Sequence, residues 1–495
     1  MIFEFANNHL ASASPDAAVA FLAYEEALLP PEIGNDQTPL REVIDRALSR
    51  SRFTGALGQF IDIIAPGGTS AARILLLGCG AKAGFGELGV ERAAADAYCR
   101  LHATGATVLE LRFDPDCAKS CAAMAFGVQL AAYRFDKYRT REKSEKKPSI
   151  SLTRIISAEP DAGRAAFQKA LPLADAIYFC RDQVSEPANV LYPTEFARRI
   201  RSLDLPGMEV EVLGEDAMRQ LGMNALLGVG QGSPRDSQLV VMRWSGGGPG
   251  EPPLAFVGKG VCYDSGGLSL KPTKSMVEMK MDMGGAGVVA GLLHALAGRR
   301  ARVNAIGILG LVENMPDGAA QRPGDIVTSM SGQTIEVVDT DAEGRLVLAD
   351  ALWYCAQRFK PRLMIDVATL AGVVGALGLE YAGLFSNDDA LADQLLRAAT
   401  VEGEKLWRLP LAVQLEKQNE SPVADIKNYG GPEGSAITAA LFLQRFVNGY
   451  PWAHLDVAGT TWQNTSTLST VPDGATGFGV RILNRWVADN FEESR

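Results

Sequence analysis

Apolar positions along this chain occur in short continuous runs separated by segments with helical spacing. Within residues 1–160, the run Ile74–Leu77 and the segment Thr107–Leu111 have the length and apolar character of buried strands, and residues 91–102 between them have helical spacing. A last strand is expected near residues 150–153. This alternation of strands and helices predicts a smaller N-terminal α/β domain.

The same alternation continues on a larger scale over residues 185–495. It predicts a larger C-terminal α/β domain with a central, mostly parallel sheet flanked by helices. Glycine-rich joins follow several of the strands, where the backbone must turn sharply or approach another segment closely. The expected strands are 239–244, 254–257, 303–309, 363–367 and 453–456, and the expected helices are 286–297, 346–359 and 435–447.

Residues 161–184 place alanine and other apolar side chains at helical spacing, with Pro172 expected as a kink or break. They predict a linker helix between a domain of residues 1–160 and a domain of residues 185–495. Two domains also fit the length, because a single hydrophobic core rarely grows beyond about 250–300 residues.

The composition is that of an ordinary globular protein, with 47% hydrophobic and 21% charged residues. Apolar runs fall short of the ~20 residues that span a bilayer, which disfavours a membrane protein. The segment Met1–Phe5 lacks the basic and apolar regions of a signal peptide, so cytoplasmic residence is the default expectation. The seven cysteines contain no C-x-x-C pair and are expected to be reduced, mostly buried thiols.

The net charge of −10 disfavours a dominant nucleic-acid surface, although a local basic patch is compatible with an acidic total. The mixed charge run at residues 136–147 predicts a solvated loop rather than a binding tail. Only four histidines are present and no H-E-x-x-H segment occurs, so any metal must bind mainly through oxygen. His294 and His454 lie in apolar segments and are expected to be packed side chains.

Two glycine motifs suggest nucleotide binding but have the wrong spacing. Gly78-Cys79-Gly80 is followed next by Gly84, which breaks the G-x-G-x-x-G pattern of a dinucleotide site. A phosphate loop at Gly258-Lys259 would need a glycine where Pro253 stands. We therefore expect a structural turn at Gly78-Cys79-Gly80 and no nucleotide binding at Gly258-Lys259.

Charged residues gather in glycine-rich, apolar sequence between residues 259 and 345. Four carboxylates brought together would repel one another and take up protons, whereas two divalent cations would cancel their charge and keep them ionised. The pattern predicts a two-metal hydrolytic site. Its members are Lys259, Asp264, Lys271, Asp282, Asp341, Glu343 and Arg345.

The local structure of the last three residues has two interpretations. If the segment is extended, Asp341, Glu343 and Arg345 project to one side, because alternate residues of a strand share a face. Alternatively, the segment is a charged loop that caps a helix beginning near Leu346, where acidic side chains favour the helix dipole. The segment alone leaves both open.

Three segments carry a resemblance to a known family: VGKGVCYDSGGLSLKP, MKMDMGGA and DTDAEGRL, in this order along the chain. They closely resemble the signature segments of the leucyl aminopeptidase family, the cytosol aminopeptidases with a dinuclear metal site. The resemblance covers nearly all of residues 180–485 and is looser in the N-terminal domain. It implies that residues 185–495 form a catalytic metallopeptidase domain.

The resemblance also implies roles for the charged residues. Asp264 and Glu343 would bridge two divalent ions, Mn²⁺ or Zn²⁺, with Lys259 and Asp282 completing one coordination shell and Asp341 the other. Lys271 and Arg345 match the family's catalytic pair: Lys271 would stabilise the oxyanion, and Arg345 would bind a bicarbonate that acts as base. A metal-activated hydroxide would then attack the first peptide bond.

What such an enzyme would act on follows from the same resemblance. It implies removal of N-terminal residues, with leucine and other apolar ones preferred, from peptides with a free N-terminus, by a leucyl aminopeptidase that assembles as a homohexamer. Met279, Thr369 and Gly372 would lie near the pocket for the first side chain, although simple core packing explains them equally well. A preference for leucyl peptides over cysteinyl-glycine stays unresolved.

Two alternative functions remain within the same family: a DNA-binding regulatory role, and a catalytically silent structural role. The net charge counts weakly against the first, and the retention of all seven charged residues counts against the second. Two departures from the family pattern flank expected ligands: Asp339 stands where asparagine is usual, and Met281 stands where a small or polar residue is common. Asp339 would add negative charge beside the metals or, if protonated, would hydrogen-bond as asparagine does.

Overall fold

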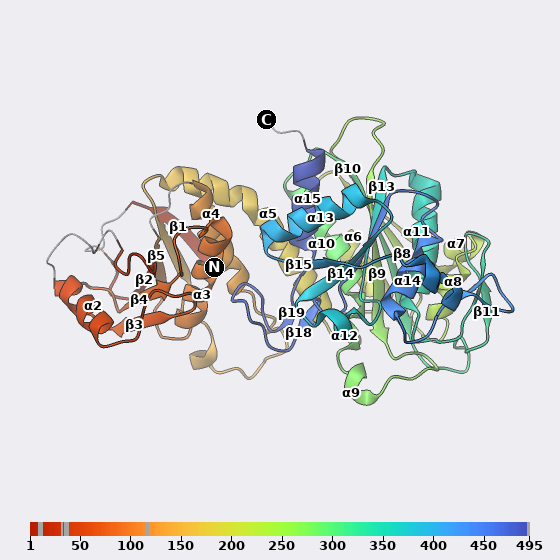
Figure 1. The fold of residues 1–495 in the computed structure, drawn as a ribbon, viewed down its shortest axis with the longest axis horizontal. Helices are drawn as coiled ribbons and strands as arrows, with labels where there is room; N and C mark the ends of the chain where they lie inside the picture. The colour runs from red at the N-terminus through yellow and green to blue at the C-terminus, as the bar shows by residue number, and fades with distance from the viewer. Residues whose placement is uncertain (8–12, 31–32, 34–38, 114–117, 493–495) are drawn as a thin grey trace. The chain divides into compact units, whose positions relative to one another are not determined.

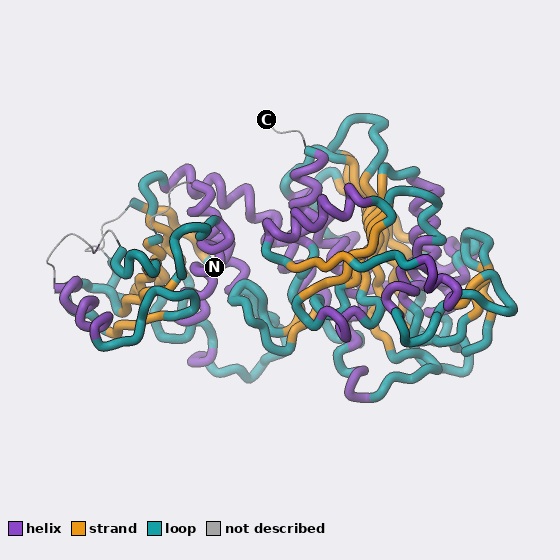
Figure 2. Tube along the Cα trace, in the orientation of Figure 1, coloured by secondary structure: helices purple, strands orange, loops and turns teal. Residues whose placement is uncertain are grey.

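The computed structural model describes the chain except residues 8–12, 31–32, 34–38, 114–117 and 493–495. The described residues form two compact units. The first contains residues 1–174 and 465–472, and the second contains residues 175–464 and 473–495. Each unit is built from a sheet with helices packed against it (Figure 1; Figure 2).

The first unit has a six-stranded sheet in the order β1-β6-β5-β2-β4-β3, parallel except for the edge strand β3. β2 is buried along its whole length, as a central strand covered on both faces must be. The strands are β1 (Ile2–Ala6), β2 (Ala17–Ala23), β3 (Phe60–Ile64), β4 (Arg73–Gly78), β5 (Val108–Arg112) and β6 (Leu152–Ile156), and the helices are α2 (Pro39–Ser49), α3 (Glu87–Leu101), α4 (Ala118–Ala131) and the 3₁₀ turn η2 (Ser144–Lys146).

The second unit has an eight-stranded mixed sheet in the order β15-β14-β17-β13-β9-β10-β8-β7. Its four central strands, β17, β13, β9 and β10, run parallel to one another. The strands are β7 (Met208–Leu213), β8 (Gln238–Ser245), β9 (Leu254–Asp264), β10 (Asn304–Asn314), β13 (Leu363–Ala368), β14 (Tyr381–Ser386), β15 (Lys405–Arg408) and β17 (Trp452–Asp456).

Two small sheets accompany the large one. They are β11 (Ile326–Thr328), β12 (Thr334–Glu336) and β16 (Ile426–Lys427), and the pair β18 (Trp462–Gln463) and β19 (Gly474–Ala475). The helices and 3₁₀ turns of this unit are α6 (Pro193–Arg201), α7 (Glu215–Gln220), α8 (Asn224–Gly230), α9 (Thr273–Met276), η3 (Met279–Met283), α10 (Gly284–Gly298), α11 (Gly344–Phe359), α12 (Val373–Leu377), α13 (Asp389–Glu402), η4 (Val413–Asn419), α14 (Ser435–Gln444) and α15 (Val480–Phe491).

Helices α10 and α11 cover opposite faces of the central strand β9. Gly258 faces Ala286 of α10 so closely that a Cβ on Gly258 would lie 2.6 Å from the Ala286 Cα, and the next residue, Lys259, lies against Gly344 at the start of α11. Successive strand residues point to opposite faces, so the two helices must lie on different sides. Lys259 therefore faces α11, on the side of the sheet opposite to α10.

The predicted fold class is confirmed: both units are α/β, and the larger one has a mixed sheet with a parallel centre flanked by helices. The sequence pattern did not single out β1 and β2. Helix α5 (Pro160–Ser185) continues through Pro172, so of the expected kink or break the break does not occur. The division between the compact units falls inside this helix, after Ala174.

One helical segment, Met279–Gly298, is long and apolar enough to cross a membrane, with a mean hydropathy of 1.2. It includes the helix expected over residues 286–297. In the structure 83% of the apolar window is buried inside the protein. Burial between the sheet and its neighbours explains the apolar composition of α10, as for a helix that is hydrophobic all round in a large core.

Six of the seven cysteines lie in the described part of the chain, and these six are free thiols. Five are buried, and burial raises the pKa of Cys79 to about 12, which disfavours the reactive thiolate. The expectation of reduced, mostly buried thiols is confirmed for these six, and Cys117 lies outside the described residues.

Candidate metal centre

The charged residues predicted from the sequence converge at the carboxyl ends of the central parallel strands. Lys259 lies within β9, Asp264 ends the same strand, and Glu343 is the N-cap of α11. In parallel α/β sheets the crevice beyond the strand ends is the usual place for a ligand site. The topology thus brings together residues that are up to 84 positions apart, from Lys259 to Glu343.

Lys259 lies at the centre of one half of the cluster. Its Nζ is 2.8 Å from Asp282 Oδ1 and 2.7 Å from Glu343 Oε1. The same Nζ donates a hydrogen bond to the carbonyl oxygen of Thr369 at 2.6 Å. Gly344 makes room for this side chain, because a Cβ there would lie 2.6 Å from the Lys259 Cε.

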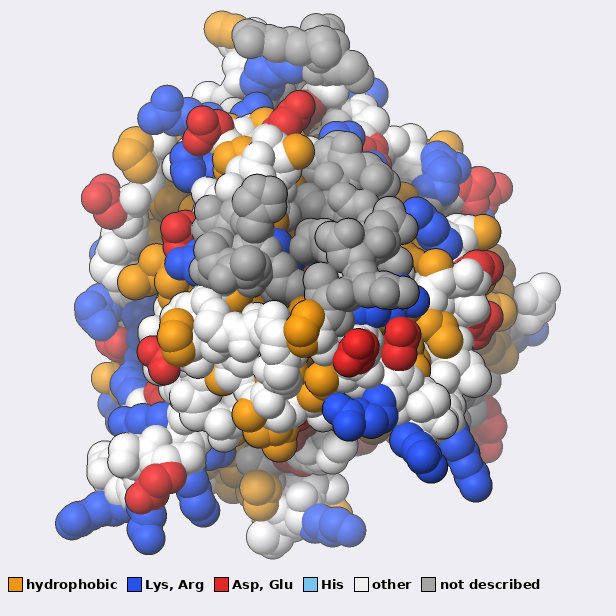
Figure 3. Space-filling model, turned by 90° about the vertical axis from the view of Figure 1, so that its left-hand side faces the viewer, with side chains coloured by type: hydrophobic (Ala, Val, Ile, Leu, Met, Phe, Trp, Pro, Cys, Tyr) orange, Lys and Arg blue, Asp and Glu red, His pale blue; other side chains and the backbone are white. Residues whose placement is uncertain are grey.

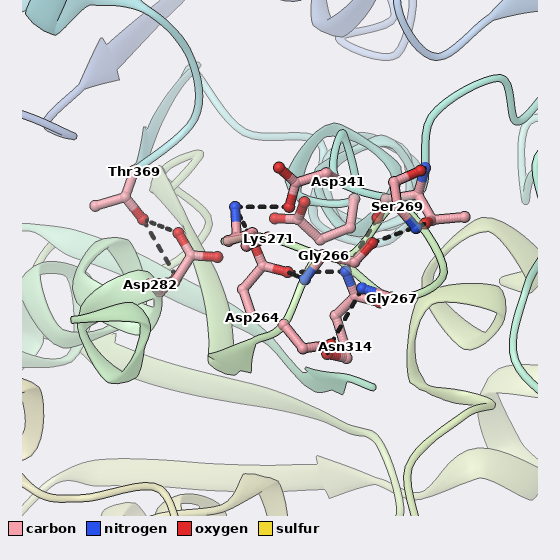
Figure 4. A network of polar contacts seen from close by, with 12 residues as sticks. Asp264, Gly266, Gly267, Ser269, Lys271, Asp282, Asn314, Asp341 and Thr369 are labelled. Carbon is pink, nitrogen blue, oxygen red and sulfur yellow. Dashed lines mark hydrogen bonds and ion pairs between the residues drawn. The ribbon is translucent and has the colours of Figure 1, made fainter. Parts of the chain in front are cut away.

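Lys271 occupies the other half. Figure 4 shows it between Asp264 and Asp341; its Nζ is 2.9 Å from Asp264 Oδ2 and 2.6 Å from Asp341 Oδ1. The loop that carries Lys271 begins at Gly266 and Gly267, whose φ angles of 88° and 65° favour glycine. This tight turn brings Lys271 back over the end of β9.

The loop of Lys271 and the loop of Asp341 bind each other through a reciprocal pair of side chains. The Ser269 N–H donates to Thr340 Oγ1 at 2.8 Å, and the Thr340 N–H donates to Ser269 Oγ at 3.1 Å. The Thr340 hydroxyl also donates to the carbonyl oxygen of Gly266 at 2.7 Å. These bonds set the distance between Lys271 and Asp341.

The extended conformation considered for Asp341, Glu343 and Arg345 is wrong. Glu343 has helical dihedrals, with φ −79° and ψ −35°, and Arg345 lies in the first turn of α11. The segment is a loop that leads into the helix, because the N–H of Asp341 bonds Asp339 Oδ1 at 2.9 Å and closes a turn. Asp341 and Glu343 nevertheless converge, through the turn and the helix start rather than through strand alternation.

Carboxylate oxygens of Asp264, Asp341 and Glu343 all lie within 4.8 Å of one another. Burial raises the pKa of Asp264, with a further contribution from Glu343. Burial and the Asp264 carboxylate raise the pKa of Asp341 to about 7. Burial opposes ionisation of Glu343 as well, but Lys259 and Lys271 outweigh it and lower the pKa of that carboxyl. Three acids thus share a space in which full ionisation is unfavourable without more positive charge.

Asp282 is the most strongly perturbed acid of the cluster. Burial raises its pKa well above the ordinary value although Lys259 lies beside it. Its Oδ1 accepts a hydrogen bond from the Thr369 hydroxyl at 2.7 Å, while its Oδ2 is buried and has no hydrogen-bond partner among the described residues. An unpartnered buried carboxylate oxygen is costly and is expected to have a further ligand.

Of the two predicted catalytic cations, Lys271 is half-buried and Arg345 is buried. Burial opposes the charge of Lys271, but the carboxylates of Asp264 and Glu343 raise its pKa above the ordinary value. Arg345 is 3% exposed, and burial lowers its pKa to about 10, so it stays charged at neutral pH. Within the described structure, its Nε and one Nη have no hydrogen-bond partner.

Comparison with known proteins places this geometry in a family. The model of the cytosol aminopeptidase family, catalytic domain, matches residues 178–484, and the model of the family's N-terminal domain matches residues 21–142. The chain belongs to the cytosol aminopeptidase family. The resemblance found in the signature segments is thereby confirmed, and this family member is an aminopeptidase.

Relatives of this aminopeptidase extend over nearly the whole chain. It is 57% identical to a probable cytosol aminopeptidase of Caulobacter vibrioides, over 97% of this chain and 98% of the relative. It is 52% identical to one of Sinorhizobium medicae, over 91% and 92%. Among solved structures, a tomato leucine aminopeptidase mutant matches with a TM-score of 0.86 and 31% identity, over 99% of this chain and 97% of that one.

A second solved structure, the bottromycin maturation enzyme BotP in complex with Mn, matches this aminopeptidase with a TM-score of 0.82 and 35% identity, over 96% of this chain and 99% of that one. Both structural matches span both units. The N-terminal unit contains none of the signature segments and resembles the family only loosely by sequence. It nevertheless contains the family's N-terminal domain, at residues 21–142.

The three residues expected near the pocket for the side chain of the substrate's first residue differ from one another in burial. Met279 begins η3 and is half-buried, and Gly372 is the exposed N-cap of α12. Thr369 is buried, and its hydroxyl bonds Asp282. Thr369 therefore contacts two predicted metal ligands, Asp282 through its hydroxyl and Lys259 through its backbone carbonyl oxygen.

Two polar residues that support the site were missed from the sequence. Asn314 ends β10 and donates from Nδ2 to Asp264 Oδ1 at 2.8 Å (Figure 4). Asp456 ends β17 and accepts the N–H groups of Leu370 at 3.2 Å and Ala371 at 3.0 Å, which orders the loop after Thr369. The signal that could have found both is a polar residue at the carboxyl end of an apolar strand.

The two histidines examined in the sequence are packed side chains, as expected. His294 contacts the Phe179 ring edge-on, and burial lowers its pKa. His454 is fully buried, with Nδ1 2.6 Å from Asp366 Oδ1. Burial opposes protonation of His454, but Asp366 outweighs it and raises the pKa. His454 lies in the core of the second unit and His294 is half-buried against Phe179, and neither ring belongs to the carboxylate cluster.

Proposed function

We propose that this aminopeptidase binds two divalent metal ions, Mn²⁺ or Zn²⁺, and removes N-terminal leucine and other apolar residues from peptides. Residues 185–495 form its catalytic domain. The observation that carries the proposal is the convergence of carboxylate oxygens of Asp264, Asp341 and Glu343 within 4.8 Å of one another, with Asp264 and Glu343 buried and Asp341 half-buried.

The donor set fits divalent cations. The proposed ligands are Lys259, Asp264, Asp282, Asp341 and Glu343, and Asp282 retains a buried oxygen without a partner among the described residues. A divalent ion beside these acids would favour their ionised forms and would depress the pKa of Lys259 so that its amine can bind as a neutral ligand. Carboxylate-rich sites suit manganese, and the similar enzyme BotP is described in complex with Mn.

When bound, the ions would supply Lewis-acid polarisation of the scissile carbonyl and a water of lowered pKa. The chain supplies the remaining charges. Lys271, cationic and 17% exposed at its side chain, is placed to stabilise negative charge on the carbonyl oxygen. Arg345 presents a buried guanidinium with two unpartnered nitrogens, within the described structure, which suits a small anion such as bicarbonate acting as a proton acceptor.

Selection of the substrate follows from the same arrangement. A free α-amine would complete the coordination at the site, which restricts cleavage to the first peptide bond. Met279, Thr369 and Gly372 are proposed to border the pocket for the first side chain, and the apolar Met279 favours leucine-like residues. We further propose a cytoplasmic homohexamer, on the basis of the resemblance to leucyl aminopeptidases.

The test combines chelation with a substitution of a bridging ligand. The enzyme is treated with EDTA, resupplied with Mn²⁺ or Zn²⁺, and assayed on leucine amide and on its N-acetylated form. We expect metal-restored cleavage of the free-amine substrate only. Glu343→Gln is expected to lower kcat/KM by a factor of about 10³ or more, because it removes a ligand charge at the site.

Asp350→Asn is the matched control. Asp350 is a second buried carboxylate on α11, about 10 Å further along the helix by its rise per residue, and it accepts the N–H groups of Leu226 and Met330. Its loss should lower stability without changing the metal requirement. Cleavage that persists in the metal-free enzyme, or equal activity of Glu343→Gln and wild type, would contradict the proposal.

The two alternative functions receive no support from the part of the chain that the structure describes. A silent structural member would be expected to have lost ligands, whereas the predicted ligands are present and clustered. A DNA-binding role needs a continuous basic surface. On the face shown in Figure 3, Lys and Arg side chains are accompanied by Asp and Glu side chains, and the net charge of the chain is −10.

A further inference from the structure

A buried amide lies behind the loop that carries Asp341 and leads to Glu343. Asn428 follows β16, which pairs in parallel with β12. Its backbone N–H donates to the carbonyl oxygen of Glu336 at 2.9 Å, which extends this pairing by one residue. The side chain is fully buried, with 0% exposure. Asn428 is therefore placed beside the loop at the point where the chain leaves β12.

The side-chain amide of Asn428 bonds both ends of this loop. Its Oδ1 accepts the N–H groups of Val338 at 2.9 Å and Asp339 at 3.3 Å. Its Nδ2 donates to the carbonyl oxygens of Asp339 at 2.6 Å and Ala342 at 3.2 Å. An asparagine amide can accept two hydrogen bonds and donate two, so the full capacity of the side chain is used on one short segment.

The pattern of donors and acceptors requires asparagine. The loop offers two N–H groups on one side of the amide and two carbonyl oxygens on the other. An aspartate at position 428 would have the same shape but no donor, and its charge would face the carbonyl oxygens of Asp339 and Ala342 in a site without solvent. A smaller side chain would leave four backbone groups of the loop without these partners.

We infer that Asn428 is a positioning residue for the metal ligands Asp341 and Glu343. Its side chain bonds Val338 and Asp339 before Asp341, and Ala342 between Asp341 and Glu343. These partners lie 86–90 positions from Asn428 in the sequence. The adjacent Tyr429 contributes to the same side of the site, because its ring lies 6.0 Å from the Arg345 guanidinium carbon. The inference rests on the proposed function, in which Asp341 and Glu343 bind metal.

The strand β10 provides a matched control. Asn304, at its first position, bonds a different loop in the same way: Oδ1 accepts the Gly247 N–H at 3.1 Å, and Nδ2 donates to the carbonyl oxygens of Gly248 at 2.9 Å and Glu251 at 3.1 Å. Asn314, at the last position, contacts Asp264. Asn304 thus lies a full strand length, roughly 33 Å by the rise per residue, from the site end of β10.

The experiment compares Asn428→Asp with Asn304→Asp in the full-length enzyme. Mn²⁺ affinity is measured by competition with a metal indicator, and kcat and KM are measured with leucine amide. We expect Asn428→Asp to lower Mn²⁺ affinity about 10- to 100-fold, the usual effect of losing a residue that orients metal ligands. Asn304→Asp should change the affinity less than twofold. Equal Mn²⁺ affinity of a folded Asn428→Asp and wild type would overturn the inference.

A metal-independent measurement separates this inference from the proposed function. Hydrogen exchange of the peptide covering residues 336–343 is recorded in EDTA for both variants, and Asn428→Ser replaces Asn428→Asp if the latter does not fold. Faster exchange confined to the Asn428 variant supports the positioning role. Unchanged exchange overturns it. If wild type and Glu343→Gln bind Mn²⁺ equally, the proposed metal site fails, while the exchange result still decides whether Asn428 orders the loop.

Discussion

Opposite charges and the absence of a side chain at a neighbouring glycine explain the position of the Lys259 side chain in the site. Lys259 contacts two carboxylates and a carbonyl oxygen, and only a glycine at position 344 leaves space for its side chain. Asp339, at a position where the resemblance leads us to expect asparagine, accepts the N–H of Asp341 through Oδ1, a bond that asparagine could make equally well. The substitution is therefore compatible with the local turn.

The unfolding free energy of the protein is expected to depend on pH through the buried carboxyl group of Asp350. Burial raises the pKa of this carboxyl from 3.8 to about 7. Between these values the unfolded chain releases the proton while the folded chain keeps it, so the contribution of Asp350 to stability is full below about pH 4 and is lost as pH rises to 7.

Urea unfolding of wild type and Asp350→Asn at pH 5 and pH 8 measures this effect. From pH 5 to pH 8 the wild type should lose up to about 3 kcal/mol of unfolding free energy that the variant does not lose, at 1.36 kcal/mol per pH unit. Other groups titrate in both proteins and cancel in the comparison. Parallel pH profiles would show that Asp350 does not titrate in this range.

Between elements, the contact of β9 with α10 decides where the site residues lie. A Cβ on Gly258 would meet the Ala286 Cα at 2.6 Å and the Gly285 carbonyl oxygen at 2.8 Å, both of them backbone atoms. Strand β9 carries Lys259 and Asp264, and helix α10 begins just after Asp282. The strand can approach the start of this helix only because Gly258 has no side chain.

Gly258→Ala is therefore expected to lower the unfolding free energy by about 1–3 kcal/mol or more, because overpacking must displace backbone. Activity should fall with it, since Lys259 is the next residue. Gly318→Ala is the control, because a Cβ there meets nothing within 4 Å, and its effect should stay within about 0.5 kcal/mol. Denaturation midpoints of the two variants test this, and similar values for both would refute the packing argument.

For the whole molecule, the predicted ligands belong to one compact unit. Lys259, Asp264, Asp282, Asp341 and Glu343 all lie in the second unit, which also contains segments from the end of the chain. The first unit includes residues 465–472, a segment far from the rest of that unit in the sequence. Unit membership thus depends on long-range packing as well as on chain order.

Metal removal is expected to act on the second unit. A ligand at 100 times its Kd stabilises the folded state by about 2.7 kcal/mol, and chelation removes this term only where the ion binds. Hydrogen exchange with and without EDTA should show loss of protection in α10 and α11 and unchanged protection in β2 and β4. An equal loss of protection in both units would contradict a metal site confined to the second one.

The sequence by itself determined the α/β class, the family, the strands β8, β9, β10, β13 and β17, and the helices α10, α11 and α14. It also indicated which charged residues cluster. These depend on short-range periodicity and on side-chain types, which are present in the sequence whatever the fold. The structure confirmed the apolar run before Asp264 as β9 and the helix after Glu343 as α11.

Only the tertiary structure decided how the ligands are held. Whether residues 341–345 extend or enter a helix depended on the turn at Asp339 and on packing of α11, and local spacing allowed both. Asn428 has no local signal, because its partners lie 86–90 positions away and meet it only when β16 pairs with β12. Hydrogen bonds between distant segments depend on the complete fold, so no sequence window contains them.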